Sequence, residues 1–131
     1  MLYFGGTWGA EPPKGEDKWD AMNKLSLDAV AREQRKKAAA ADSGRSAETV
    51  FGGHERSLRQ TVIALRAGVE LAEHENPGEA TVQVLSGRVE LRSHGGLMWS
   101  GRSGDLLAVP DDRHSLHALE DSAVLLTVVK K

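Results

Sequence analysis

Residues 50–131 contain short apolar segments that alternate with turn signals, and this feature constrains the fold more than any other. Within the segments, apolar residues recur with a period close to two, as they do in strands with one buried face. The gaps between segments are too short for crossover helices, so neighbouring strands are expected to run antiparallel. The pattern predicts an all-β sandwich or barrel. The segments comprise residues 58–65, 81–85, 89–92, 97–99, 106–109 and 124–129.

The N-terminal part divides into an irregular extension, residues 1–22, and a helical arm, residues 23–49. Pro12-Pro13 forbids a helix across the extension. In the arm, residues 26–41 predict a helix, because Ser26 suits the N-cap and the alanine run favours helix formation. The face expected to be buried is thin and consists of Leu27, Val30, Ala31, Gln34 and Ala38.

The second half of the expected helix carries a basic surface formed by Arg32, Arg35, Lys36 and Lys37. One interpretation is contact with an anion or a nucleic acid. The other is a solvated face whose cations interact favourably with the C-terminal end of the helix dipole, which is the more common case for a charge run.

Composition excludes several classes of protein. The 131 residues contain no cysteine, which excludes disulfides, a thiolate nucleophile and iron–sulfur ligation. The formal charge is −2, from 17 Lys and Arg against 19 Asp and Glu, which argues against nucleic-acid binding. No run of about 18 apolar residues and no secretory signal pattern is present, so a cytoplasmic protein without membrane partners is expected.

Two glycine-framed motifs carry a resemblance to a known family. Residues 68–87 read Gly-Val-Glu-Leu-Ala-Glu-His-Glu-Asn-Pro-Gly-Glu-Ala-Thr-Val-Gln-Val-Leu-Ser-Gly, and residues 104–114 read Gly-Asp-Leu-Leu-Ala-Val-Pro-Asp-Asp-Arg-His. They resemble G(X)5HXH(X)3–4E(X)6G and G(X)5PXG(X)2H(X)3N, the two motifs of the cupin superfamily. The resemblance implies a small single-domain, RmlC-like cupin, which is a jelly-roll β-barrel, here with an N-terminal helix and arm.

The same resemblance implies a metal site with two histidines and a glutamate from the first motif and a histidine from the second. His74 matches the first histidine, and His114 matches the last, one residue early. Asn76 replaces the second histidine and Ala80 replaces the glutamate, while Asp112 replaces a glycine of the second motif. The motifs are therefore degenerate at the metal ligands.

Glu79 lies one residue from the glutamate position, and strand alternation turns it to the opposite face unless a bulge intervenes. The metal implied by the resemblance is a divalent transition metal: iron, manganese, zinc or nickel. His74 and His114 would be its ligands, with Asn76 as a weak third, although catalytic sites generally use three protein ligands. The alternative is that both histidines are interior polar residues, hydrogen-bonded to each other, to Asn76 or to water.

Two other histidines are placed by local pattern. His114 and His117 are three residues apart, so in a strand only one of them can face the interior. His94 precedes Gly95-Gly96 and is expected in an exposed hairpin turn.

Two classes of function stay open, and no catalytic residue is defined. The first is a small-molecule-binding cupin whose pocket is lined by His74, Asn76, Val82, Val84, Leu107 and His114. The second is a metal-dependent cupin enzyme of the dioxygenase or isomerase type. A third possibility is a role of the dimer or partner surface. A homodimer is expected, because short antiparallel sheets leave edges to cover.

Overall fold

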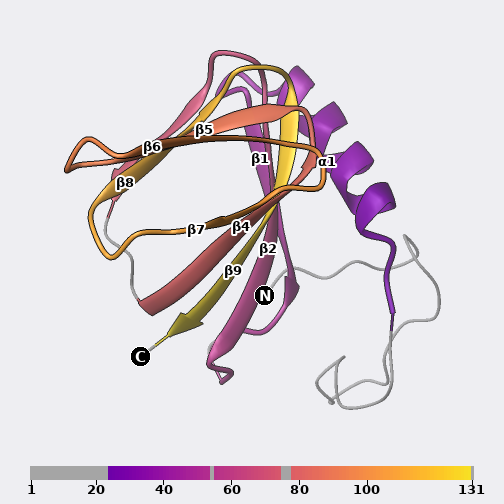
Figure 1. Ribbon diagram of the computed structural model, residues 1–131. Coiled ribbons are helices and arrows are strands. Elements are labelled where there is room, and N and C mark those ends of the chain that lie inside the picture. Colours follow the sequence, from indigo (N-terminus) through magenta and orange to yellow (C-terminus); the bar gives the residue numbers. More distant parts are fainter. Residues whose placement is uncertain (1–23, 54, 75–77, 131) are drawn as a thin grey trace.

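The computed structural model describes residues 24–53, 55–74 and 78–130, which form one helix and nine strands (Figure 1). The helix is α1 (Leu27–Ala40). The strands are β1 (Arg45–Phe51), β2 (Leu58–Leu65), β3 (Glu70–His74), β4 (Gly78–Ser86), β5 (Arg88–Ser93), β6 (Met98–Arg102), β7 (Leu106–Ala108), β8 (His114–Ala118) and β9 (Ser122–Lys130). The extension 1–22 and Asn76 lie outside the described residues. In the described part of the chain, no helix is long and apolar enough to cross a membrane.

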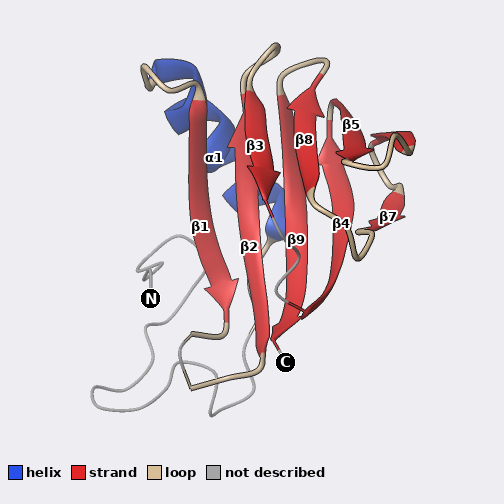
Figure 2. Ribbon diagram, turned by 90° about the vertical axis from the view of Figure 1, so that its left-hand side faces the viewer, coloured by secondary structure: helices blue, strands red, loops and turns tan. Residues whose placement is uncertain are grey.

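The strands form two antiparallel sheets that pack face to face (Figures 1 and 2). The larger sheet has the order β1-β2-β9-β4-β7, and the smaller has the order β3-β8-β5-β6. Helix α1 covers the outer face of the larger sheet, on the side away from β3 and β8 (Figure 2). The expected all-β jelly-roll with an N-terminal helix is confirmed.

An inner core fills the space between the two sheets. Its positions follow the two-residue period of the strands: in β4, Val82 and Val84 are buried, whereas Gln83 between them is exposed. Burial of this apolar face holds the two sheets together. The inner core comprises Leu65, Val82, Val84, Val89, Leu91, Leu107, Val109, Leu116, Ala118 and Val124.

Helix α1 begins at the predicted cap, since the side chain of Ser26 accepts a hydrogen bond of 3.1 Å from the backbone N–H of Ala29. Val30 and Ala31 pack against the outer face of the larger sheet. Gln34 is buried and donates to the Glu48 carboxylate at 2.8 Å, so a polar contact also fixes the helix to β1. The predicted buried face of the helix is confirmed.

The barrel begins earlier in the chain than the sequence pattern indicates. Residues 45–49, expected in the helical arm, belong to β1 and pair with β2 from Arg45↔Leu65 onward. β1 is an edge strand, and Val50 is its single buried residue. Because an edge strand with little buried surface needs few apolar residues, its sequence lacks the period that marks the other strands.

Candidate functional site

The candidate site is centred on His114, the first residue of β8. Along β8 the buried positions are His114, Leu116 and Ala118, and the latter two belong to the inner core. His114 therefore occupies the inner face of the smaller sheet, and it is 6% exposed. Its Nδ1 lies 3.0 Å from the carbonyl oxygen of Asp112. Because a carbonyl can only accept, Nδ1 is the donor in this contact.

A β-bulge in β3 gives His74 the ladder position next to His114. Leu71 pairs with Leu116, and His74 pairs with His114, so β3 advances three residues where β8 advances two. One extra residue is thereby accommodated in β3, and positions 71 and 74 both stand opposite inner-face positions of β8. The structure describes the backbone of His74 but not its side chain, and Asn76 lies outside the described residues.

Ala80 occupies the position that the resemblance assigns to a glutamate, and no neighbouring residue of β4 supplies a carboxylate to the interior. Ala80 packs against the inner core, and Glu79 is exposed. The irregularity in the pairing of β4 with β9 lies between Val84 and Ser86, far along the strand from Glu79. The prediction that strand alternation turns Glu79 away from the interior is thus confirmed.

The donors near His114 bear on the metal that the resemblance implies. Among the described residues, no group of three or more His, Asp or Glu side chains is arranged to hold a metal ion. Ala80 offers no oxygen in place of the implied carboxylate, so the charge of a divalent cation would not be balanced by that position. The donors that the structure describes do not make up the ligand set that the resemblance implies.

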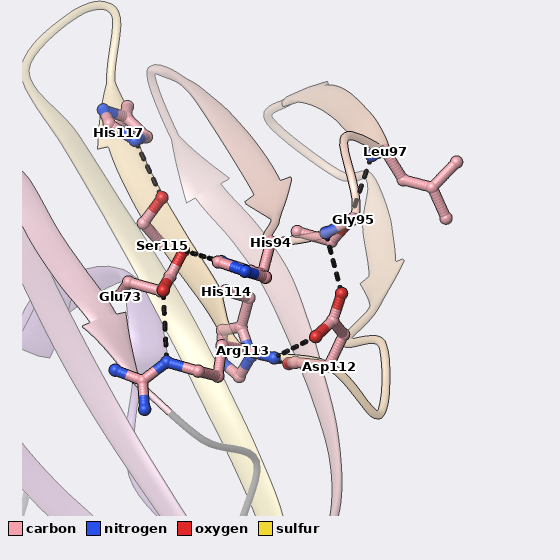
Figure 3. Close-up of polar contacts among 10 residues, drawn as sticks. Glu73, His94, Gly95, Leu97, Asp112, Arg113, His114, Ser115 and His117 are labelled. Atoms are coloured by element: carbon pink, nitrogen blue, oxygen red, sulfur yellow. Dashed lines mark hydrogen bonds and ion pairs between the residues drawn. The ribbon is translucent and has the colours of Figure 1, made fainter.

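A network of side chains, here called the rim network, surrounds the start of β8 and consists of Glu73, His94, Asp112 and Arg113 (Figure 3). Arg113 Nε donates to one oxygen of Glu73 at 3.1 Å, and His94 Nδ1 lies 3.2 Å from the other. The hydrogen bonds from Arg113 and His94 hold the pKa of Glu73 below its usual value of 4.5. The Glu73 carboxylate is therefore engaged by both Arg113 and His94 at the rim.

Asp112 orients His114 and joins two loops. Its carboxylate accepts hydrogen bonds of 2.8 Å from the backbone N–H groups of Gly95 and Arg113. These bonds tie the loop before β8 to the hairpin between β5 and β6 (Figure 3). The backbone carbonyl of Asp112 accepts a hydrogen bond from His114 Nδ1. The residue that departs from the second motif thus contacts the histidine through its backbone carbonyl and the neighbouring hairpin through its side chain.

The rim network was missed by sequence reasoning. His94 lies in the hairpin turn as predicted, and its side chain is 67% exposed. Its contact with Glu73 spans 21 residues of sequence, and the contact of Arg113 with Glu73 spans 40. Neither pair leaves a local pattern, so a single sequence offers no signal for it.

His117 lies on the opposite face of β8 from His114. Its Nε2 is 2.9 Å from Ser115 Oγ and 3.4 Å from Glu70 Oε2. A serine, a histidine and a carboxylate together suggest nucleophilic catalysis. A catalytic triad, however, requires the carboxylate and the hydroxyl on different ring nitrogens, whereas both partners here meet Nε2. This group is a polar contact on the outer face of the sheet.

The apolar residues predicted to line a pocket lie in the inner core. Val82, Val84 and Leu107 are 4%, 0% and 9% exposed. They share the space between the sheets with Leu116, which follows His114 on the inner face of β8. Their role in ligand binding stays a prediction.

No protein-family model matches the chain, and no curated protein matches it in sequence. Solved structures do match. A conserved protein of unknown function from Streptococcus pyogenes is 29% identical with a TM-score of 0.62, over 70% of this chain and 78% of that one. An RmlC-like cupin from Desulfovibrio desulfuricans is 26% identical with a TM-score of 0.57, over 65% and 81%.

A third neighbour is a much longer protein. The salicylate 1,2-dioxygenase from Pseudoaminobacter salicylatoxidans is 19% identical with a TM-score of 0.66, over 79% of this chain and 32% of the enzyme. At that identity the likeness concerns the fold alone.

The two facing antiparallel sheets and their common inner core define a cupin-type barrel. With these neighbours and the two motifs, the chain belongs to the cupin superfamily.

Proposed function

We propose that this chain is a small-molecule-binding cupin in which His114 makes the principal polar contact with the ligand. The observation that supports this role is the state of His114: nearly buried on the inner face, with Nδ1 committed to the Asp112 carbonyl. Small-molecule sites combine apolar walls with a few precisely placed polar groups. Inner-core residues such as Val82 and Leu107 are suited to be the walls.

The surroundings of His114 indicate the chemistry of the ligand. Nδ1 donates to the Asp112 carbonyl, so the imidazole is held in one orientation beside the apolar inner core. A polar ring next to an apolar interior suits a ligand that pairs an apolar body with a hydroxyl or amide group. The carbonyl of Asp112, whose carboxylate is bonded to Gly95 and Arg113, keeps the ring in place before the ligand arrives, which reduces the entropy lost on binding.

A metal-dependent enzyme of the dioxygenase or isomerase type is the alternative hypothesis. The ladder pairing of His74 with His114 favours it, and iron, manganese, zinc or nickel would suit two imidazoles with Asn76 as a weak third ligand. Ala80 argues against it, because the anionic ligand of the implied set is replaced by a methyl group. The binding function is therefore the one we favour.

Metal analysis and ligand screening on matched histidine variants test the proposal. Untagged protein, purified without chelator or nickel resin, is analysed by elemental mass spectrometry as wild type, His114→Ala and His117→Ala. The same three proteins are screened against small hydroxylated and amide-bearing compounds by thermal shift. We expect no stoichiometric metal, and compounds that raise the Tm of wild type and His117→Ala but not of His114→Ala.

Two outcomes contradict the proposal. Near one equivalent of a single transition metal, lost in His114→Ala and kept in His117→Ala, would establish the metal-dependent alternative. Compounds that stabilise all three proteins equally, or none that bind, would mean that His114 is an interior structural residue.

The homodimer and the cytoplasmic location expected from the sequence stay predictions. Leu97, Met98 and Trp99 are exposed, and the latter two lie on β6, the edge strand of the smaller sheet. Exposed apolar side chains on a sheet edge are typical of a surface that pairs with another chain. They support the dimer that the sequence led us to expect.

A further inference from the structure

A hollow of about 260 Å³ lies between the C-terminal half of α1 and the end of β2. It is on the outer side of the larger sheet, whereas His114 is on the inner face of the smaller one. Its lining includes four cations, Arg32, Arg35, Lys36 and Arg66, against one carboxylate, Asp121. The balance of charge within the hollow is strongly positive, although the whole chain has a formal charge of −2.

Arg66 is held in a fixed position. Its Nη1 donates to the carbonyl oxygens of Ala39 and Ala41, at 3.4 and 3.2 Å. A Cβ placed on Gly44, whose φ is +71°, would lie 3.1 Å from Arg66 Nη2, so the guanidinium packs closely on that turn. Arg66 thereby satisfies the last carbonyls of α1 and offsets the negative end of its dipole, which would otherwise repel an anion.

The other three cations have no partner among the residues that the structure describes. Arg35 and Lys36 lie three and four residues after Arg32, so both are neighbours of Arg32 on the surface of α1. None of them forms an ion pair or a side-chain hydrogen bond within the described ranges. Like charges at this spacing destabilise a helix, and a bound anion would relieve that repulsion.

The one carboxylate is partly occupied by the fold. Asp121 Oδ1 accepts a hydrogen bond of 2.8 Å from the backbone N–H of Ala67, in the turn after β2. The hollow therefore contains more cationic donors than the chain itself uses.

We propose that this hollow binds the phosphate groups of a small oligophosphate ligand. Four cations call for more than one negative charge, and guanidinium groups match the oxygens of a phosphate in pairs. The volume lies just below the roughly 300–1,000 Å³ typical of small-ligand pockets, which suits a compact ligand. The acidic overall balance of the chain does not favour a nucleic-acid strand as the occupant.

Isothermal titration with inorganic triphosphate at low salt tests the proposal on a matched pair of variants. Lys36 lines the hollow, whereas its neighbour Lys37 is an exposed cation on the same helix that does not. We expect Lys36→Gln to weaken binding several-fold and Lys37→Gln to leave it unchanged. The double variant Arg35→Gln/Lys36→Gln should lose about tenfold or more in affinity, as removal of charge-assisted hydrogen bonds does.

A second double variant controls for net charge. Arg88→Gln/Arg102→Gln also removes two exposed arginines, which are paired across β5 and β6 and line a separate hollow of about 310 Å³. This variant should bind triphosphate as the wild type does. Urea unfolding of every variant checks that the fold is retained.

Three results would overturn the proposal. The first is no binding of triphosphate to the wild type, and the second is an equal loss in the two double variants or in the two single ones. The third comes from a short single-stranded RNA: tighter binding than triphosphate, weakened equally by Lys36→Gln and Lys37→Gln, would identify a nucleic-acid surface instead.

Discussion

The two faces of the smaller sheet hold the same side chain in different ways. On the inner face, His114 is nearly buried and is bonded to a backbone carbonyl. On the outer face, His117 meets the hydroxyl of Ser115 and the carboxylate of Glu70, and the Glu70 side chain is 56% exposed. The inner ring is oriented by the main chain, whereas the outer ring is oriented by two side chains that solvent reaches.

This difference shows that a histidine is better preorganised on the inner face of the sheet than on the outer face. A contact with the main chain persists when neighbouring side chains change, and burial protects it from competition with water. A surface ion pair contributes little and is screened by salt. The inner face therefore holds an imidazole in a fixed orientation, and the outer face has an adaptable contact.

The largest expected effect concerns the packing of the two faces. Leu116→Ala, on the inner face, should lower the free energy of unfolding by about 2–5 kcal/mol, because it removes buried methyl groups and leaves a cavity. Ser115→Ala, on the outer face of the same strand, should cost only about 1 kcal/mol for one hydrogen bond to His117. Urea unfolding measures both. Equal losses would mean that the two faces are not packed differently.

An intermediate effect is expected from restoring the missing carboxylate. Ala80→Glu places an acid at the position that the family motif assigns to a metal ligand, and it should raise affinity for zinc at least about tenfold, or ~1.4 kcal/mol. Gln83→Glu adds the same charge at an exposed position of the same strand and should leave the affinity unchanged. A chromogenic chelator titration gives both values. No gain in Ala80→Glu would indicate that the two histidine positions do not form a metal site.

The smallest effect is expected at the rim. The pKa of Glu73 is lowered in the folded state, chiefly by the hydrogen bond from Arg113 and then by that from His94, so folding favours its ionised form. The resulting stabilisation is complete above the usual pKa of 4.5 and is lost as the pH falls through the lowered folded value. Glu73→Gln should therefore be less stable than the wild type at neutral pH.

Urea unfolding at a series of pH values follows this difference, which should shrink in acid. Glu79→Gln is the matched control, because Glu79 is exposed and makes no ion pair with a described residue. A difference for Glu73→Gln that stays constant from neutral to acid would show that its carboxylate charge does not stabilise the rim.

Much of the fold could be predicted from the sequence, because its signals are local. The alternation of Val82, Gln83 and Val84 is visible in four residues or fewer, and it marks one buried face. Gly68 and Gly87 take φ values of +86° and +84°, which most other residues avoid, so these motif glycines mark turns. Ser26 likewise announces the start of α1.

The candidate site was predictable only in part. His114 was found through a motif, and Ala80 revealed the missing carboxylate. Edge strand β1 was not predicted, because it buries only one residue and so lacks the two-residue period. The bulge in β3 was not predicted either, and it shifts the alternation by which residues are assigned to the two faces of the strand. The contacts of Glu73 with Arg113 and His94 join distant segments, which depends on how the strands pair.

The bulge in β3 lets the inside and the outside of the barrel vary independently. Between ladder positions 71 and 74, a regular strand would have room for one residue, but this strand has two, Ala72 and Glu73, and both are exposed. Despite the extra residue, positions 71 and 74 of β3 still pair with successive inner-face positions of β8. It adds one side chain to the exterior. An insertion of this kind lets the side chains on the outer surface of a barrel change while the arrangement of its interior is preserved.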